Sequence, residues 1–189
     1  MSESSTHHET RSGLLLLCID LQPVFLEAMS AGDTVQRRCS FAIQAAAGMG
    51  VEVAFTEQVP EKLGGTLPTL LELVTSPRVF AKQTFSALGD AAIRDALVSR
   101  KTEHVLLCGI ETSVCIYQTA LDALSAGLQV TLLSDCVGAR RPDDATVCID
   151  ALIRAGVHVL PSETVFYALL HEVRHAFFRS YTKLVKTYS

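Results

Sequence analysis

Short apolar runs alternate with helix-like segments along almost the whole chain, and this alternation constrains the fold more than any other feature. Six runs have the length and composition of buried strands: 14–20, 51–58, 78–82, 104–110, 128–135 and 157–162. Helical periodicity is found between them at 35–50, 90–101, 114–126 and 143–156, and the tail after residue 162 is also expected to be helical. Strands that alternate with helices in this way predict a parallel sheet with helices on both faces.

We therefore expect a three-layer α/β/α, doubly wound, Rossmann-like domain with six parallel strands in the order 3-2-1-4-5-6. A chain of 189 residues is long enough for one such core. Residues 13–189 are predicted to form a single domain, preceded by a polar and flexible segment at residues 1–12. Hydrophobic residues make up 49% of the chain, which fits a sheet that is covered on both faces.

Charge and apolar run length restrict the partners that this domain can have. The formal net charge is −4, so no long-range attraction draws the chain to phosphate backbones, and nucleic acid is an unfavourable partner. The longest apolar stretch, LLLLCI, is too short to cross a bilayer, so no membrane contact is expected. The six cysteines form no CxxC pair and the first residues are polar. Reduced thiols and a cytoplasmic location are expected, with association with mitochondria left open.

Three polar or nucleophilic residues stand where predicted strands end. Asp20 closes the first strand, Lys82 closes the third, and Cys115 follows the fourth strand in the stretch GIETSVC. Ligands of doubly wound sheets bind beyond the carboxyl ends of the strands, near the point where the strand order reverses. We therefore expect Asp20 and Cys115 to lie nearly in contact, and Lys82 to reach them with its long side chain.

These residue types suit a nucleophilic mechanism. At the first turn of a helix, the thiolate form of a cysteine is favoured over the thiol, and a nearby ammonium would favour the thiolate further. Asp20 could take up the thiol proton and return it to a leaving group, while backbone N–H groups at the turn hold an oxyanion. Each residue alone also has a structural explanation: the aspartate as a helix cap, the lysine as a solvated side chain and the cysteine as an inert thiol.

The segments LCIDLQPVF, FAKQTFSAL and LLCGIETSVCIYQTALDAL resemble the isochorismatase-like cysteine hydrolases, a superfamily that includes nicotinamidases and N-carbamoylsarcosine amidase. The similarity covers about residues 13–165. Within the superfamily, the sequence most resembles the eukaryotic isochorismatase-domain-containing group. It implies the isochorismatase-like hydrolase fold and a catalytic triad of Asp20, Lys82 and Cys115. It also implies a cis peptide bond between Ile110 and Glu111, and an oxyanion hole formed by the N–H groups of Glu111 and Cys115. Assembly into a homo-oligomer, a dimer or a tetramer, is expected on the same basis.

The sequence departs from the nicotinamidases after the second strand. Nicotinamidases bind zinc there through an Asp-x-His pair, whereas this chain reads TEQVPEK, without histidine. We therefore expect neither a metal nor any other cofactor. The predicted activity is that of a metal-independent cysteine hydrolase, which acts on a small amide or related carbonyl substrate through a cysteine thioester. The alternatives are a non-catalytic scaffold and a nucleic-acid-associated, ribonuclease-like role, for which the main local support is the basic stretch ARRP at 139–142.

Several other residues are candidates for a function. Gln22, Phe25, Gln58 and Phe85 are predicted to bind the substrate, although the phenylalanines could pack in the core and the glutamines could cap helices. HEVRH at 171–175 matches a zinc-protease signature, but a chance match on a solvated terminal helix explains it better because no third ligand follows. The remaining cysteines are expected to be small core residues, although Cys136, after the fifth strand, could also line the pocket: Cys18, Cys39, Cys108, Cys136 and Cys148.

Overall fold

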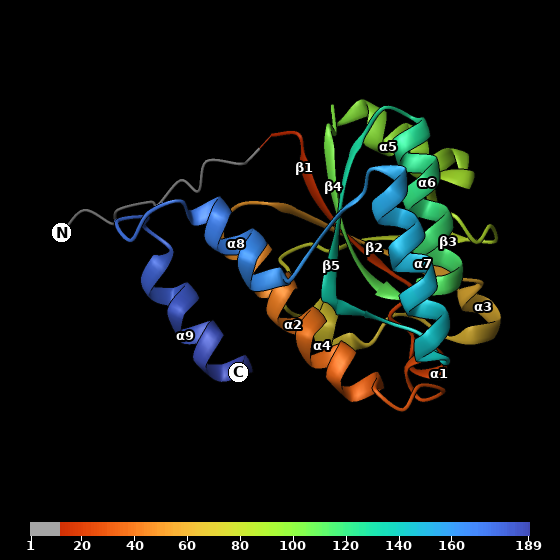
Figure 1. The fold of residues 1–189 in the computed structure, drawn as a ribbon, viewed down its shortest axis with the longest axis horizontal. Helices are drawn as coiled ribbons and strands as arrows, with labels where there is room; N and C mark the ends of the chain where they lie inside the picture. Colours follow the sequence, from red (N-terminus) through yellow and green to blue (C-terminus); the bar gives the residue numbers. More distant parts are fainter. Residues whose placement is uncertain (1–11) are drawn as a thin grey trace.

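The computed structural model describes residues 12–189, in which strands and helices alternate as the sequence pattern predicts (Figure 1). The strands are β1 Leu14–Ile19, β2 Glu52–Gln58, β3 Arg78–Lys82, β4 His104–Ile110, β5 Gln129–Gly138 and β6 His158–Leu160. The α-helices are α1 Pro23–Leu26, α2 Gly32–Gly48, α3 Pro60–Leu63, α4 Pro68–Leu71, α5 Ala91–Ser99, α6 Tyr117–Ser125, α7 Pro142–Ala155, α8 Ser162–Leu170 and α9 Phe178–Tyr188. Apart from Ser12, the segment predicted to be flexible (1–12) lies outside the described residues.

The sheet has the predicted order, β3-β2-β1-β4-β5-β6, and all of its pairs are parallel. The central strand β1 pairs with β2 on one side and with β4 on the other. Ile19, the last residue of β1, lies opposite Thr56 of β2 and Gly109 of β4. The carboxyl ends of these three strands therefore meet at one edge of the sheet, where parallel sheets bind their ligands.

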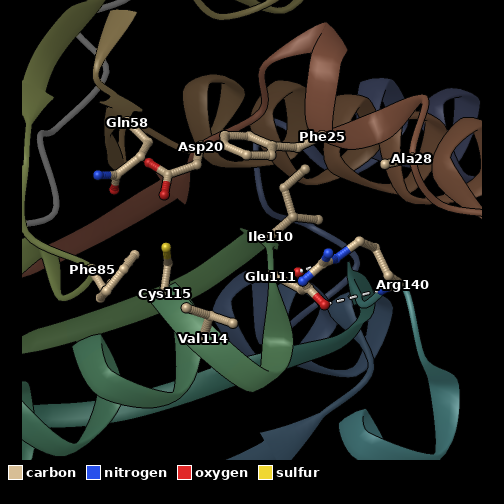
Figure 2. Close-up of a pocket in the computed structure, with 10 residues that line it drawn as sticks. All are labelled: Asp20, Phe25, Ala28, Gln58, Phe85, Ile110, Glu111, Val114, Cys115 and Arg140. Atoms are coloured by element: carbon tan, nitrogen blue, oxygen red, sulfur yellow. Dashed lines mark hydrogen bonds and ion pairs between the residues drawn. The ribbon is translucent and has the colours of Figure 1, made fainter. Parts of the chain in front are cut away.

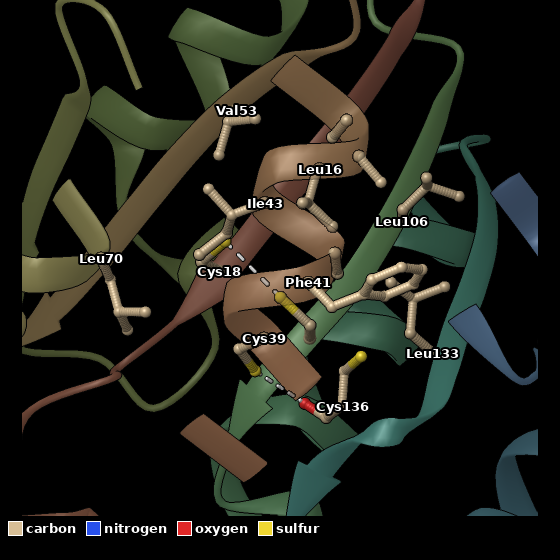
Figure 3. Close-up of a cluster of buried hydrophobic side chains, with 14 of the residues drawn as sticks. Leu16, Cys18, Cys39, Phe41, Ile43, Val53, Leu70, Leu106, Leu133 and Cys136 are labelled. Carbon is tan, nitrogen blue, oxygen red and sulfur yellow. Dashed lines mark hydrogen bonds between the residues drawn. The ribbon is translucent and has the colours of Figure 1, made fainter. Parts of the chain in front are cut away.

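Successive residues of the central strands point to opposite faces of the sheet, as the two-residue period of a strand requires. On one face, Leu16 belongs to an apolar cluster with residues of α2, α8 and α9. Figure 3 shows Leu16 together with Phe41 and Ile43 of α2. On the other face, Leu15 and Leu17 belong to a second cluster with residues of α5, α6 and α7. Figure 1 shows these two sets of helices on opposite sides of the sheet. The predicted three-layer architecture is therefore present.

The first of these clusters also contains four of the six cysteines: Cys18, Cys39, Cys108 and Cys136. All four are completely buried, and the prediction that they are core residues is confirmed. Burial raises the pKa of the Cys18 thiol. Cys148 lies on α7, within the predicted helix, but it differs from the prediction because it is only partly buried.

Strand β5 extends three residues beyond the predicted end at residue 135. The pairing with β4 shifts register after Leu107, so that Gly109 lies opposite Val137 and Ile110 lies opposite Gly138. After this irregularity, β5 stays paired with β4 up to the carboxyl edge of the sheet. The extension places the loop after Gly138 beside the strand ends that carry the predicted catalytic residues.

The prediction of a helical tail after residue 162 is wrong for residues 171–177. Helix α8 ends at Leu170, the next residue, His171, has a φ of +65°, and α9 begins only at Phe178. Phe177 lies against Gly48, where an added Cβ would approach its ring to within 2.0 Å, and the ring of Tyr181 packs on Phe41. These contacts turn α9 back onto α2. No helix within residues 12–189 combines the length and the apolar character that are needed to cross a membrane.

Candidate active site

The structure brings Asp20, Lys82 and Cys115 together at the carboxyl edge of the sheet. Asp20 follows β1, Lys82 is the last residue of β3, and Cys115 lies in a π-helical turn, Thr112–Ile116, that follows β4. The Lys82 Nζ atom lies 2.8 Å from Asp20 Oδ2 and 3.8 Å from Cys115 Sγ. Its side chain crosses the end of β2 to reach them, as the strand order predicts. Figure 2 shows the Cys115 sulfur facing the Asp20 carboxylate.

The Lys82 ammonium is held by an unusually complete set of acceptors. Besides Asp20, it donates to Gln58 Oε1 at 2.6 Å and to the carbonyl oxygens of Thr84 and Phe85 at 3.1 and 3.2 Å. The Lys82 side chain is 0% exposed, so these contacts replace the water that the charge has lost. The ammonium is therefore fixed in place and has little capacity left for another ligand.

The Asp20 carboxylate is fixed from two sides. Thr56 Oγ1 donates a hydrogen bond to Oδ1 at 2.7 Å, and Lys82 donates to Oδ2. The Asp20 backbone has a φ of +51°, a left-handed conformation that aspartate tolerates better than most residues. Conformations of this kind gather at functional sites, where the surrounding structure holds them.

The turn that carries Cys115 begins with a close approach between β4 and β1. Gly109 has a φ of +110°, and a Cβ at this position would lie 2.1 Å from the carbonyl oxygen of Ile19. One residue further along the chain, the peptide bond between Ile110 and Glu111 is cis. The N–H of Glu111 donates a hydrogen bond to the Cys115 thiol, which lowers the pKa of that thiol. Only glycine at position 109 lets the end of β4 approach β1 so closely.

The structure does not favour the Cys115 thiolate in the way that its position at the start of a helix suggests. The pKa of Cys115 is raised to about 12, first because burial penalises the thiolate and second because the Asp20 carboxylate repels it. The Lys82 ammonium and the Glu111 N–H act in the opposite direction but do not compensate. Cys115 is 7% exposed, so the helical turn favours the thiolate much less than the sequence position suggests. The resting thiol therefore carries its proton, next to a carboxylate that can receive it.

This electrostatic arrangement predicts how Cys115 reacts with iodoacetamide. Since the raised pKa lies far above neutrality, the ionised fraction rises about tenfold per pH unit from about pH 7 to about pH 10. The alkylation rate at Cys115, followed by peptide mass spectrometry, should climb across this range without a plateau. Asp20→Asn removes the repelling carboxylate and should lower the pKa, so alkylation at pH 8 should become faster by about tenfold per pKa unit lost. A plateau below pH 8 in the unmodified protein would contradict this account.

A cavity of about 280 Å³ opens above these residues. Its wall contains Asp20, Cys115 and three of the predicted substrate-binding residues, Phe25, Gln58 and Phe85 (Figure 2). Sequence reasoning missed the other residues of the wall, which are Ala28, Ile110, Val114 and Arg140, and assigned Glu111 only through its backbone N–H. A signal for Arg140 was available, because it follows the fifth strand and therefore lies at the same edge of the sheet.

Gln22 is the predicted substrate-binding residue that the structure does not bring to the cavity. Its side chain is 0% exposed: it donates to the carbonyl oxygens of Gln58 and Gly64, and it accepts a hydrogen bond from the Gln58 N–H at 2.7 Å. Gln22 therefore holds the backbone of Gln58, whose side chain in turn contacts Lys82. Gln22 therefore stabilises a residue of the cavity wall without lining the cavity itself.

The HEVRH segment does not have the geometry of the signature that it resembles. It lies between α8 and α9, and not on a terminal helix as expected, so His171 and His175 do not share a helix face. His175 Nδ1 accepts a hydrogen bond from the Phe177 N–H at 3.1 Å. Within residues 12–189, no group of three or more histidine, cysteine, aspartate or glutamate side chains is arranged to hold a metal ion.

Comparison with known proteins agrees with this fold and site. The family model described as the isochorismatase domain matches residues 14–164. The chain belongs to the isochorismatase family. Isochorismatase domain-containing protein 2 of Bos taurus is 34% identical to it over 176 residues, which make up 93% of this chain and 83% of the relative.

Two solved structures extend the comparison of this isochorismatase-family chain. The MAR1 ribonuclease from Caenorhabditis elegans is 30% identical and superposes with a TM-score of 0.87, over 94% of this chain and 91% of the other. The YcaC gene product of Escherichia coli, described as an octameric hydrolase of unknown specificity, has a TM-score of 0.81 over 93% of each chain. At 18% identity, the second comparison shows the shared fold alone.

Proposed function

We propose that this isochorismatase-family protein is a cysteine hydrolase that acts on a small amide or related carbonyl compound through a thioester on Cys115. The observation that carries the proposal is the contact of one buried ammonium with both a carboxylate and a thiol at the floor of a cavity. Lys82 lies 2.8 Å from Asp20 and 3.8 Å from Cys115. The cavity of about 280 Å³ has room for a small molecule but not for a folded chain.

In the proposed mechanism, Asp20 takes the proton of Cys115 while the sulfur attacks the carbonyl carbon of the substrate. This coupling suits a thiol with a raised pKa, because the carboxylate that disfavours the thiolate is also the group that accepts its proton. The N–H groups of Glu111 and Cys115 would hold the oxyanion, for which each donor contributes about 3 kcal/mol in comparable sites. Asp20 then returns the proton to the leaving group, and water, activated by Asp20, hydrolyses the thioester.

Lys82 has a supporting part in these steps. Its ammonium orients the carboxylate and faces the sulfur, so it stabilises the negative charge as it moves between Asp20 and Cys115. The mechanism uses no metal, in line with the absence of histidine from the segment TEQVPEK after β2. All of the proton transfers are assigned to one residue, Asp20.

Acyl transfer from p-nitrophenyl acetate would test the proposal before the natural substrate is known. We expect an initial burst of p-nitrophenol and, after a rapid acid quench, an acetyl group on the peptide that contains Cys115. A steady release should follow as water resolves the thioester. Acetylation confined to lysine side chains, with no modified Cys115 peptide at any time, would contradict the proposed nucleophile.

A second candidate function is the cleavage of RNA, because the similar protein from Caenorhabditis elegans is called a ribonuclease. The basic stretch at 139–142 gives this function limited support, since Arg140 pairs with Glu111 and Arg141 pairs with Asp144. Incubation of the protein with an end-labelled single-stranded RNA at increasing salt concentrations would test this function. If the protein contacts RNA phosphates, both binding and cleavage should fall steeply as the salt concentration rises.

We also propose that the protein is a homo-oligomer, a dimer or a tetramer. The support is the structural similarity to a bacterial protein that is described as octameric. Light scattering after size-exclusion chromatography would give the molar mass. A mass equal to that of one chain at all concentrations would exclude assembly.

A further inference from the structure

Strand β2 lies between the strands that carry the ion pair of the site, but the proposed chemical steps give none of its residues a part. Its neighbours are β1, which leads into Asp20, and β3, which ends at Lys82. Thr56 and Gln58 are two residues apart on β2, so their side chains point to the same face of the sheet. The Thr56 side chain contacts Asp20, and the Gln58 side chain contacts Lys82. The strand therefore holds both charged groups.

The hydroxyl of Thr56 makes two contacts with Asp20. It accepts a hydrogen bond from the Asp20 N–H at 3.3 Å, and it donates one to Asp20 Oδ1 at 2.7 Å. A threonine hydroxyl has a single hydrogen to donate. Because the Asp20 N–H is itself a donor, the hydroxyl meets it with a lone pair, and its hydrogen is left for Oδ1. The hydroxyl is therefore a fixed donor to the carboxylate.

The other oxygen of the carboxylate is held by Lys82, whose Nζ lies 2.8 Å from Asp20 Oδ2. Each carboxylate oxygen has two lone pairs, so room is left for the proton of Cys115. Figure 2 shows the carboxylate facing the Cys115 sulfur. If Lys82 were the sole partner, the carboxylate could rotate about its Cβ–Cγ bond and direct both oxygens to the ammonium. The hydrogen bond from Thr56 opposes this rotation.

Thr56 can influence the reaction only through Asp20. Its residue is 0% exposed and is not part of the cavity wall, so it does not meet a ligand. The charged and titratable groups that face the carboxylate are Lys82 of β3 and Cys115 of the turn after β4. Thr56 adds a neutral donor from β2. A hydrogen bond donated to a carboxylate favours its ionised form, which is the form that can accept a proton.

We infer that Thr56 is a positioning residue of this enzyme, which keeps the Asp20 carboxylate ionised and turned toward the Cys115 thiol. The inference rests on the proposed function, because Asp20 is the proton acceptor there. The chemical step is unchanged: the S–H bond of Cys115 breaks, the proton passes to Asp20, and the sulfur forms a bond to the carbonyl carbon. Thr56 adds control over the lowest pH at which this step can occur.

Thr56→Val tests the assignment, because valine has the shape of threonine but no hydroxyl. The measured quantities are kcat and KM for p-nitrophenyl acetate from about pH 4 to about pH 8. We expect kcat to fall about ten- to hundredfold, the effect of losing a hydrogen bond to a charged group. The KM should change little, since Thr56 does not line the cavity. The acidic limb of the profile of kcat/KM against pH should move up by about one pH unit.

Thr56→Ser is the conservative variant. It keeps the hydroxyl, so it should restore the position of the acidic limb and most of the turnover. Thr56→Ala lacks the hydroxyl and should show the same displaced limb as Thr56→Val. The position of a limb does not depend on how much of the protein is folded, so the comparison holds even if one variant is less stable.

Thr131→Val is the matched control. Thr131 is also a buried threonine on a strand, β5, and its hydroxyl lies 2.8 Å from His104 Nε2. Thr131 is not part of the wall of the catalytic cavity. This variant measures the general effect of removing a buried hydroxyl from the sheet, and its pH profile should match that of the unmodified protein.

An acidic limb that stays in place in Thr56→Val, whatever the loss of turnover, would overturn the assignment and leave the cysteine hydrolase proposal intact. An equal displacement in Thr56→Ser or in Thr131→Val would also overturn it, because the hydroxyl contact with Asp20 would then not be the cause. Turnover by the unmodified protein without an acetylated Cys115 peptide would contradict the proposed function, and with it this role of Thr56.

Discussion

Replacement of Cys115 by alanine should lower the turnover of p-nitrophenyl acetate at least about ten-thousandfold, because removal of a covalent nucleophile leaves only binding and oxyanion stabilisation. The acetylated Cys115 peptide should disappear at the same time. The loss is expected to be this large because no other cysteine can substitute. Cys18, Cys39, Cys108 and Cys136 are completely buried in the core, and Cys148 lies on α7, outside the wall of this cavity.

Cys148→Ala is the matched control. It removes a thiol that is more accessible than Cys115 but that does not face Asp20, so turnover should be unchanged. The unfolding midpoint of Cys115→Ala in urea should shift little, because the sulfur borders a cavity and its removal leaves most of the surrounding packing in place. Turnover that survives in Cys115→Ala would show that another group is the nucleophile. Loss of turnover together with loss of the folded state would not count as support.

Comparison of Cys115→Ala with Asp20→Asn separates the two functions that the site requires. Both variants should lose turnover, the first because the nucleophile is gone and the second because the proton acceptor is gone. Only Asp20→Asn should keep a thiol that reacts with iodoacetamide, and that thiol should react faster, since the Asp20 charge raises its pKa. A structural role of Asp20 alone would not produce this opposite response of alkylation and turnover.

The features that the sequence predicted correctly follow from short-range periodicity. The alternation of apolar runs with helical segments was sufficient to predict the strand order, and the strand ends then predicted that Asp20, Lys82 and Cys115 would meet. Lys82 is an example. Its position two strands from β1 implied that its side chain must pass over the end of β2 to contact Asp20, and the structure shows that contact. Both results depend only on parallel strands having their carboxyl ends at one edge.

The features that the sequence did not predict depend on packing between distant segments. The pKa of Cys115 is set by how deeply the π-helical turn is buried and by the proximity of Asp20, and neither follows from a position after a strand. Gln22 lies two residues after Asp20 in the sequence, but its amide is hydrogen-bonded to the backbone of Gln58. The break between α8 and α9 depends on contacts of the tail with α2. Periodicity carries no information about such contacts.

Replacement of Gly109 by alanine should destabilise the protein by more than about 3 kcal/mol, among the larger effects of single substitutions. Two independent causes combine at this position. The φ of +110° is unfavourable for any residue with a Cβ, and the Cβ would lie 2.1 Å from the Ile19 carbonyl oxygen. That oxygen belongs to the central strand and cannot move without displacing the β1–β4 pair. Urea unfolding followed by circular dichroism would measure the loss.

Gly127→Ala is the control that isolates the second cause. Gly127 also has a positive φ, +81°, but an added Cβ there would meet no atom within 4 Å, so the expected cost is about 1 kcal/mol. Equal destabilisation of the two variants would show that the close approach of β4 to β1 is unimportant. A larger effect at position 109 would have a consequence for catalysis, since Ile19 precedes Asp20 and Gly109 begins the turn to Cys115. The same contact that excludes a side chain at Gly109 holds the carboxylate and the thiol within reach of one ammonium.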